Sequence, residues 1–104
     1  MIPRFIYKIL THEEWKNFKK RKIFLNSLDV KSGFVHLSTK KQVNGTINKY
    51  FFDYSILVLV SFKFADLKKN LEWEISRDGN LFPHFYGKLD IKKVYNYKII
   101  RQPL

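Results

Sequence analysis

Three short stretches of the chain place polar side chains that could do chemistry among apolar ones. They are Gly33-Phe34-Val35-His36-Leu37-Ser38-Thr39, Trp73-Glu74-Ile75-Ser76-Arg77 and Leu81-Phe82-Pro83-His84-Phe85-Tyr86-Gly87. Each falls at a predicted strand end or turn, where binding and catalytic residues are concentrated. Their imidazoles, carboxylate, hydroxyls and aromatic rings can hold the oxygen atoms of a ligand and stack on a flat ring.

The first stretch offers a histidine and a hydroxyl on one face. In an extended segment His36 and Ser38 project to the same side, opposite Val35 and Leu37. If that side is a cleft, Ser38 helps a ribose hydroxyl or phosphate meet free backbone N–H groups at the start of the next helix. A structural interpretation is equally open, with Ser38 or Thr39 only capping that helix and His36 a core histidine satisfied by a carbonyl.

The second stretch carries an acidic residue on a strand. Glu74 follows Trp73, so the two side chains point to opposite faces, one packed and one turned away. An exposed surface carboxylate is the plainer interpretation of Glu74, because charges on strand faces are ordinary. Arg77 beside Asp78 is likewise consistent with an ion pair in a turn.

The third stretch is the least ordinary part of the sequence. Pro83 removes a ladder donor, and three aromatic residues crowd around His84 before Gly87 allows a sharp exit. Such a cluster suits a wall on which a flat ring stacks, although aromatic clusters more often form plain core.

Familiar catalytic and metal-binding patterns are absent from the sequence. It contains no G-x-S-x-G, H-E-x-x-H, P-loop or G-x-G-x-x-G string. Zero cysteines exclude a disulfide framework, a thiolate metal site and a cysteine nucleophile. The histidines at positions 12, 36 and 84 are a poor zinc set, so we expect no metal.

Hydrophobic periodicity and capping signals predict the elements that position these stretches. Thr11 with Glu14 and Thr39 with Gln42 have the capping-box spacing, so a helix is expected after each. Strands are expected over residues 5–10, 34–37, 55–64, 71–75 and 94–100, helices over 12–22 and 40–51, an irregular connector over 23–30, at most a helical turn over 66–70, and a turn over 77–80. This order predicts an α+β fold with a mostly antiparallel sheet.

Length and composition indicate a globular protein. The 104 residues fit a single domain, 1–104, and the 45% hydrophobic content supplies its core. The longest aliphatic run, 56–60, is far below the roughly 18 residues of a membrane span. The apolar N-terminus is broken by Arg4 and Lys8 and lacks a cleavage site, so we expect a cytoplasmic protein without a membrane partner.

The formal charge of +11 has two explanations. Clustered Lys and Arg gain affinity for polyanions by releasing counterions, which makes RNA a possible partner. However, 16 of the 20 basic residues are Lys, beside many Ile, Phe, Asn and Tyr, which is the composition that AT-rich codons produce. Because Arg is preferred for planar phosphate recognition, this Lys excess supports RNA binding only weakly.

Taken together, the three stretches resemble the bacterial family catalogued as domain of unknown function 952. The G-F-[IV]-H-L-S-T and F-P-H-x-Y-G strings carry the resemblance, which covers nearly the whole chain. It also includes Ile6-Tyr7-Lys8-Ile9, Trp15, Gln42, Thr46 and Trp73-Glu74. That family is grouped with the ADP-ribosyltransferase-like fold, so the resemblance implies a split, mostly antiparallel sheet with two main helices that cradles NAD.

The resemblance also implies roles for individual residues. The H-L-S string is similar to one in RNA 2′-phosphotransferases, whose site binds NAD and accepts an RNA phosphate. The expected catalytic residues are Glu74, His36 and His84, with Glu74 stabilising an oxocarbenium-like centre. The residues expected to bind NAD or a related nucleotide are Tyr7, Lys8, His36, Ser38, Thr39, Arg77, Phe85 and Tyr86. Two alternatives stay open, a noncatalytic module for ADP-ribose or nucleotides and a basic RNA-associated protein.

Overall fold

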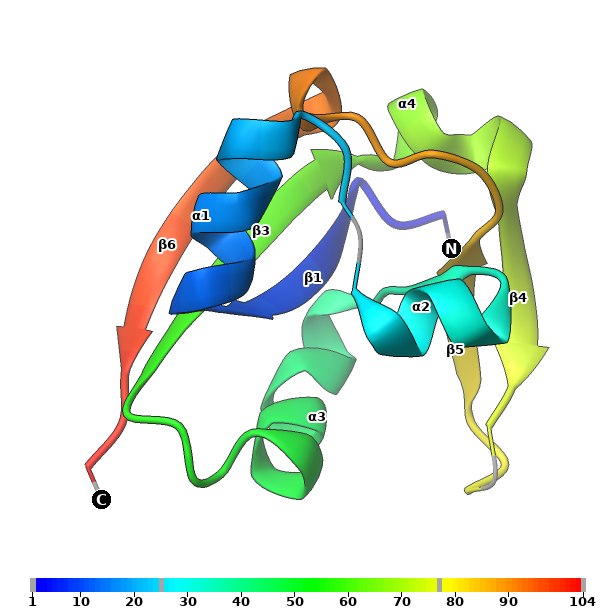
Figure 1. The fold of residues 1–104 in the computed structure, drawn as a ribbon. Coiled ribbons are helices and arrows are strands. Elements are labelled where there is room, and N and C mark those ends of the chain that lie inside the picture. The colour runs from blue at the N-terminus through cyan, green and yellow to red at the C-terminus, as the bar shows by residue number, and fades with distance from the viewer. Residues whose placement is uncertain (1, 25, 77, 104) are drawn as a thin grey trace.

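The fold is built from two three-stranded antiparallel sheets with helices packed around them (Figure 1). The computed structural model describes residues 2–24, 26–76 and 78–103. The first sheet has the order β1 (Phe5–Thr11), β3 (Ile56–Lys63), β6 (Val94–Arg101), and the second has the order β2 (Val35–His36), β5 (Leu81–Phe85), β4 (Leu71–Ile75). The predicted α+β class with antiparallel strands is confirmed.

An isolated bridge joins the two sheets. Tyr7 in β1 and Ser38, just after β2, exchange two backbone hydrogen bonds of 2.8 Å each. Leu37 donates its N–H to the Pro83 carbonyl at 3.1 Å, but Pro83 has no N–H to return, and the pairing of β2 with β5 ends at His36. The short β2 is therefore held between β1 and β5, and the sheets diverge on either side of it.

The first sheet is packed on both faces. Its central strand is β3, as the aliphatic run predicts. On one face Ile6 and Leu10 of β1 pack with Trp15 and Phe18 of α1 (His12–Arg21), which begins with the predicted capping box. On the other face Ile9 packs with a smaller cluster that includes the buried residues of α3 (Val43–Tyr50).

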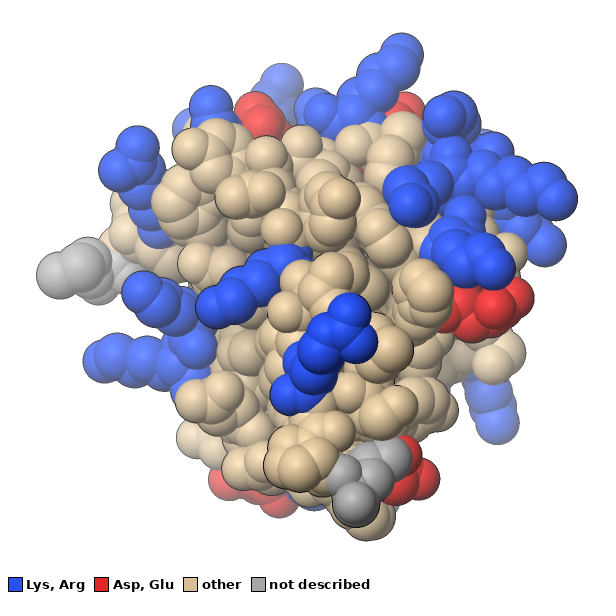
Figure 2. All heavy atoms as spheres, turned by 90° about the vertical axis from the view of Figure 1, so that its left-hand side faces the viewer, with Lys and Arg blue, Asp and Glu red and all other residues tan. Residues whose placement is uncertain are grey.

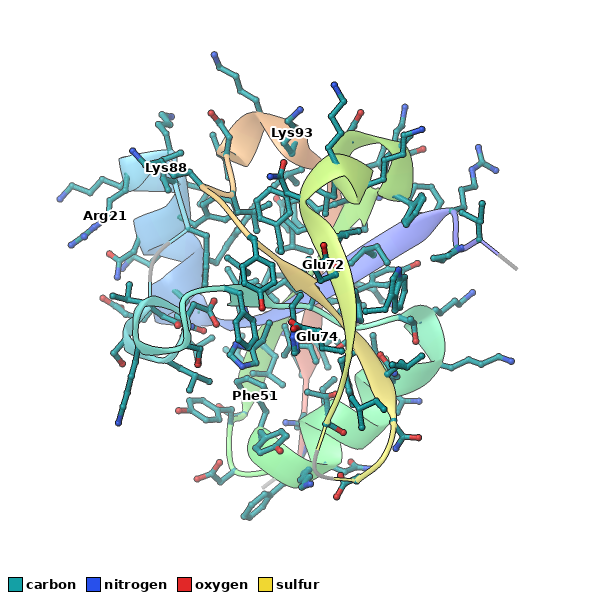
Figure 3. The ribbon with its side chains drawn as sticks, turned by 90° about the vertical axis from the view of Figure 1, so that its right-hand side faces the viewer. Arg21, Phe51, Glu72, Glu74, Lys88 and Lys93 are labelled. Atoms are coloured by element: carbon teal, nitrogen blue, oxygen red, sulfur yellow. The ribbon has the colours of Figure 1, made fainter. Side chains whose placement is uncertain are left out.

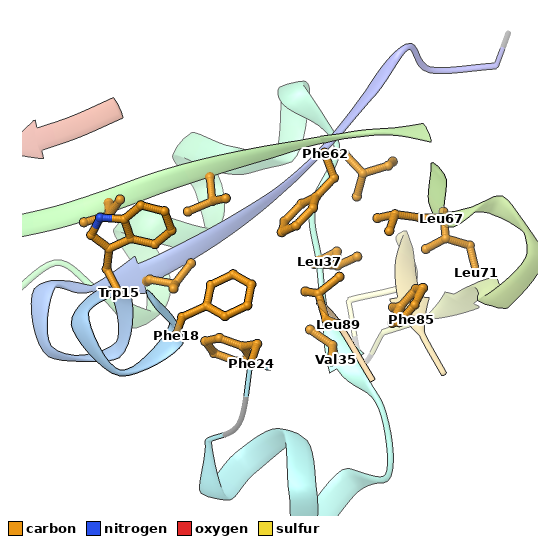
Figure 4. Packing of buried hydrophobic residues seen from close by; sticks show 14 residues of the cluster. Trp15, Phe18, Phe24, Val35, Leu37, Phe62, Leu67, Leu71, Phe85 and Leu89 are labelled. Carbon is orange, nitrogen blue, oxygen red and sulfur yellow. The ribbon is translucent and has the colours of Figure 1, made fainter. Parts of the chain in front are cut away.

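The main core crosses from the first sheet to the second (Figure 4). Phe62 of β3 and Phe18 of α1 are almost completely buried in it. Val35 of β2 and Phe85 of β5 belong to the same cluster, together with Leu71 of β4. Since these residues alternate with polar ones along their strands, one face of the second sheet is core and the opposite face is left for other uses.

The second predicted helix begins as a short 3-10 helix, η1 (Lys40–Gln42), and continues as α3. The Gln42 side chain accepts a hydrogen bond from the Thr39 N–H at 3.0 Å and donates to the Leu81 carbonyl at 2.6 Å. Gln42 thereby fixes the start of this helix against β5.

The predicted irregular connector over 23–30 is wrong from Ser27 onwards, because α2 (Ser27–Ser32) lies there. Asn26 caps it by accepting the Asp29 N–H at 2.8 Å, and Gly33 ends it with φ 83°. The pattern hid this helix, since its apolar residues Leu28 and Val30 face solvent while its buried residue is Asp29. Hydrophobic periodicity cannot detect a helix that buries a charge.

The remaining elements are short. The turn expected over 66–70 is two brief helices, α4 (Phe64–Leu67) and η2 (Lys68–Asn70), and η3 (Ile91–Lys93) precedes β6. Two backbone hydrogen bonds close the predicted turn over 77–80: the Ser76 N–H donates to the Asn80 carbonyl at 2.8 Å, and the Gly79 N–H donates to the Ser76 carbonyl at 3.0 Å. Arg77 itself lies outside the described residues. No described helix is long and apolar enough to cross a membrane.

Candidate functional site

Four rings and a carboxylate meet on the face of the second sheet that points away from the main core. We call Phe34, His36, His84, Tyr86 and Glu74 the ring cluster. His36 and His84 are direct partners across β2 and β5, with ring centroids 5.4 Å apart. Phe34 stacks on His84 at 4.0 Å and lies 4.6 Å from His36 and 5.4 Å from Tyr86. Pairing and stacking thus bring together residues that are far apart in the sequence.

Glu74 is the acidic member of the ring cluster and is the last residue but one of β4 (Figure 3). Its Oε1 atom is 2.7 Å from His84 Nδ1 and accepts a 2.7 Å hydrogen bond from the Tyr86 hydroxyl. No described residue bonds to Oε2, and 42% of the side chain is exposed. Glu74 therefore offers one carboxylate oxygen to a ligand while the other is held in place.

These hydrogen bonds shift the acidity of both partners. The bonds from His84 and Tyr86 lower the pKa of Glu74, because they favour its ionised form. The same bond raises the pKa of Tyr86, since its proton is shared with the Glu74 carboxylate. Glu74 is consequently a carboxylate over the whole neutral range.

His36 is held from behind by a buried acid, Asp29. Its Nδ1 atom lies 2.7 Å from Asp29 Oδ1, and its backbone N–H donates to the same oxygen at 3.3 Å. Lys8 reaches the pair from β1, with Nζ 3.3 Å from Asp29 Oδ2 and 2.8 Å from the His36 carbonyl oxygen. Because Nδ1 is occupied, Nε2 is the nitrogen of His36 that remains for a ligand.

The buried charges of this pair influence each other. Burial alone raises the pKa of Asp29, but the hydrogen bonds from His36 and the charge of Lys8 outweigh it, so the pKa lies below its usual value. Burial lowers the pKa of Lys8 more than the charge of Asp29 raises it. Asp29 is thus ionised at neutral pH, as a partner for Lys8 and His36 must be.

A chain of hydrogen bonds positions Asp29 from α1. Glu14 Oε1 accepts the Thr11 N–H at 2.9 Å, and Glu14 Oε2 accepts a 2.9 Å bond from the Asn26 side chain. Asn26 in turn caps α2 at Asp29. The sequence analysis missed Asp29; the Asn26-x-x-Asp29 spacing, an N-cap with an acid three residues on, is the signal that could have found it.

Three of the predicted binding residues are not accessible at this site. Phe85 is only 7% exposed and lies in the main core, because it pairs with Val35 on the packed face, so the expected stacking of Phe85 on a ligand is corrected. Ser38 is buried, and its backbone joins the two sheets. Lys8 is also buried and supports His36 from behind.

Two further predicted residues, Tyr7 and Thr39, line a separate groove of about 670 Å³. Its other residues are Ile2, Pro3, Arg4, Phe5, Lys40, Lys41, Phe64 and Trp73, and we call it the aromatic groove. Trp73 and Glu74 are neighbours on β4, so they point to opposite faces. The ring cluster and the aromatic groove are therefore separate surfaces.

A protein metal site needs several ligating side chains grouped together. In residues 2–24, 26–76 and 78–103, no three His, Cys, Asp or Glu side chains are grouped as metal ligands. His36 and His84 are bound to carboxylates through Nδ1, which fixes the orientation of each ring.

The fold and site define a small α+β protein with a partly exposed histidine–carboxylate cluster. Residues 9–97 match the family described as a protein of unknown function, DUF952, and the chain belongs to that family. It is similar to protein CC0527 from Caulobacter crescentus, whose crystal structure is 36% identical with a TM-score of 0.84 and covers 91% of this chain and 84% of that one. The solution NMR structure of CC0527 is 37% identical with a TM-score of 0.80, covering 90% and 82%. No curated protein matches the chain.

Proposed function

We propose that the ring cluster binds NAD or a related nucleotide and transfers its ADP-ribose unit, as an ADP-ribosyltransferase-like site would. The observation that carries this proposal is the Glu74 carboxylate, with one oxygen held by His84 and Tyr86 and the other open to a ligand. An ionised carboxylate fixed beside a histidine is what a reaction through a cationic sugar centre needs.

The chemistry follows from the positions of these groups. When the nicotinamide–ribose bond breaks, the bonding electrons go to the positively charged nicotinamide ring, which leaves as neutral nicotinamide. Positive charge then develops on the ribose. Glu74 stabilises that charge and accepts a hydrogen bond from a ribose hydroxyl through Oε2. The acceptor oxygen then bonds to the ribose carbon that nicotinamide has left. Where the acceptor is a hydroxyl, its proton passes to His36 Nε2, because Nδ1 is tied to Asp29, whereas an ionised phosphate oxygen bonds without giving up a proton.

The arrangement of the elements supports the ADP-ribosyltransferase-like grouping. That grouping is implied by resemblance to the family and predicts a split antiparallel sheet cradling NAD. Two antiparallel sheets meeting at the bridge between Tyr7 and Ser38 are compatible with it. The similarity of the H-L-S string to RNA 2′-phosphotransferases makes an RNA 2′-phosphate a candidate acceptor, beside a protein side chain.

A noncatalytic module for ADP-ribose or nucleotides is the second candidate. Phe34 covers one face of His84, whose side chain is only 13% exposed. His84 therefore supports Glu74 more than it reaches a ligand, which leaves fewer groups for proton transfer. A site that only binds a nucleotide needs no group for proton transfer.

Two substitutions separate the candidates. Glu74→Gln keeps the size of the side chain and a hydrogen bond to ribose but loses the charge, so we expect near-normal binding with nicotinamide release reduced about 10²–10³-fold. His36→Ala removes a ligand contact and should weaken binding itself. Calorimetric titration with NAD and ADP-ribose, then a nicotinamide-release assay with an RNA 2′-phosphate or protein acceptor, measures both.

The outcomes differ for each candidate. Binding without release by the wild-type protein, with every acceptor, supports the noncatalytic module. An absence of binding by NAD, ADP-ribose and mononucleotides at millimolar concentration contradicts both.

A further inference from the structure

The aromatic groove has the walls of a stacking site. Phe5 and Tyr7 of β1 are half-buried, and Trp73 of β4 is 38% exposed, although all three lie in strands. Aromatic rings left partly open in a concave surface offer flat faces on which a planar ligand ring can stack. Since these rings come from both sheets, the groove exists only in the folded chain.

The rim of the groove is positively charged. Arg4, Lys40 and Lys41 line it, and no acidic residue is among its described lining residues. Among the described lysines, Lys8 forms an ion pair with Asp29 and Lys49 forms one with Asp78. Arg4, Lys40 and Lys41 take part in none of the ion pairs of the described residues, and the Arg4 guanidinium lies 5.4 Å over the Phe5 ring. The rim therefore presents positive charge to an anionic ligand, and phosphate pairs well with Arg and Lys.

Hydrogen bonds hold the rim in position. The Arg4 carbonyl accepts the Phe64 N–H at 2.9 Å, which fixes the approach to β1. Lys40 and Lys41 belong to η1, which Gln42 anchors to β5 through its 2.6 Å bond to Leu81. The backbone that carries the cations is therefore set by the fold.

We propose that the aromatic groove binds a nucleotide, with its base against Trp73 and its phosphate between Arg4 and the η1 lysines. The volume of about 670 Å³ falls within the usual range for small-ligand sites. Aromatic walls combined with cations are the chemistry that recognises single nucleotides or the units of a single strand. Because the groove and the ring cluster are separate surfaces, this proposal stands independently of the proposed function.

Trp73 provides a direct reporter of binding. The chain has two tryptophans, and Trp15 is buried in the main core. In a Trp15→Phe variant, Trp73 is the sole tryptophan, and stacking should quench its fluorescence in a saturable way. If that variant folds poorly, the indole N–H signal of Trp73 in NMR spectra of the wild-type protein gives the same readout.

The titrants are AMP, adenosine and a short oligoadenylate. We expect AMP to quench Trp73 with an affinity at least several-fold above that of adenosine, because only AMP engages the rim. A Lys40→Ala/Lys41→Ala variant should bind AMP about tenfold more weakly. Lys16→Ala is the matched control, since Lys16 is an exposed lysine of α1 outside the groove, and it should leave the affinity unchanged.

The comparison of titrants identifies the source of the nucleotide. Tighter binding of oligoadenylate than of AMP indicates a strand, whereas equal binding indicates a free nucleotide. Glu74→Gln and His36→Ala should leave quenching of Trp73 intact, which distinguishes failure of this proposal from failure of the proposed function. No change at Trp73 with millimolar AMP or oligoadenylate, or an affinity unaffected by the Lys40→Ala/Lys41→Ala change, overturns it.

Discussion

Asp29 and Glu74 each bind a histidine through Nδ1, but their surroundings differ. Asp29 is buried between His36 and Lys8, whereas Glu74 is partly exposed and shares its bound oxygen with Tyr86. The buried acid is suited to fixing a ring in place, and the exposed one is suited to meeting a ligand. This difference leads to separate predictions for the two carboxylates.

Replacing Asp29 by Asn should destabilise the protein. The change leaves the Lys8 ammonium buried without a counter-charge, and breaking such a pair costs about 3–5 kcal/mol of unfolding free energy. Urea unfolding at neutral pH measures the loss. The Lys8→Met/Asp29→Asn double variant should recover part of it, since the uncompensated charge is then removed; equal stability of wild type and Asp29→Asn would contradict the account.

The stability difference between the wild-type protein and Asp29→Asn should depend on pH. The folded-state pKa of Asp29 is lowered, so its contribution is fully present above its unfolded pKa of about 3.9 and is lost as pH falls through the folded value. The stability difference between wild type and Asp29→Asn should therefore shrink in acid. If the difference in unfolding free energy stayed constant as the pH fell through the folded-state pKa of Asp29, Asp29 would not be the ionised partner of Lys8.

Glu74→Gln should change the acidity of Tyr86. The Glu74 carboxylate raises the pKa of Tyr86, so loss of its charge should lower that pKa towards the ordinary value. Carbon NMR of the ring during alkaline titration measures it residue by residue. Tyr97, which is exposed and contacts Trp15 instead, serves as an internal control, and its ring signals should be the same in both proteins.

At the scale of elements, two glycines occupy different backbone conformations, one left-handed and one helical, so replacing each by alanine should have opposite effects on stability. Gly33 ends α2 with φ 83°, so Gly33→Ala should cost about 1 kcal/mol through backbone strain alone, as no atom lies within 4 Å of the added Cβ. Gly45 lies within α3 with equal space and an ordinary φ, so Gly45→Ala should stabilise by about 0.5–1 kcal/mol. Thermal unfolding of both variants checks the contrast in sign.

Sequence patterns predicted those elements whose signals lie within a few neighbouring residues. The capping pair of Thr11 and Glu14 and the aliphatic run of β3 are local signals, and both α1 and the central strand lie where they indicate. α2 escaped because its buried residue is charged and its helix has only six residues. Local periodicity carries no information about a partner such as Lys8, which comes from another element.

The candidate site was predictable in part for the same reason. Alternation along strands indicates which face His36 and Glu74 occupy, and the structure brings them into one cluster with His84 and Tyr86. The division of the remaining residues between the core and the aromatic groove depends on how the two sheets diverge. That geometry is set by tertiary contacts that no single stretch encodes.

At the scale of the whole molecule, the +11 charge is widely distributed. Lys and Arg side chains project from several parts of the face in Figure 2, with a concentration at one upper corner. On the opposite side, Arg21 and Lys88 lie at the upper left and Lys93 at the top, all apart from Glu74 (Figure 3). A spread of this kind favours nonspecific attraction of polyanions over a single reading surface.

Salt dependence distinguishes charge from specific recognition. If the charge serves RNA binding, the affinity for a single-stranded RNA should fall steeply between low and physiological salt. A plot of the logarithm of the binding constant against the logarithm of the salt concentration should have a slope of about −0.7 for each phosphate contacted. Binding of a mononucleotide should depend on salt far less. Fluorescence anisotropy at two salt concentrations measures both, and negligible RNA binding at low salt would remove the RNA-associated alternative.

The central claim, that the ring cluster binds NAD or a related nucleotide, is tested most directly by the imidazole signals of His36 and His84. Long-range proton–nitrogen NMR spectra recorded during titration with NAD resolve both rings and both nitrogens of each. We predict saturable shifts that are largest at His36 Nε2, while His12, an exposed histidine at the start of α1, stays unchanged. Unchanged His36 and His84 signals at millimolar NAD and ADP-ribose would contradict the claim.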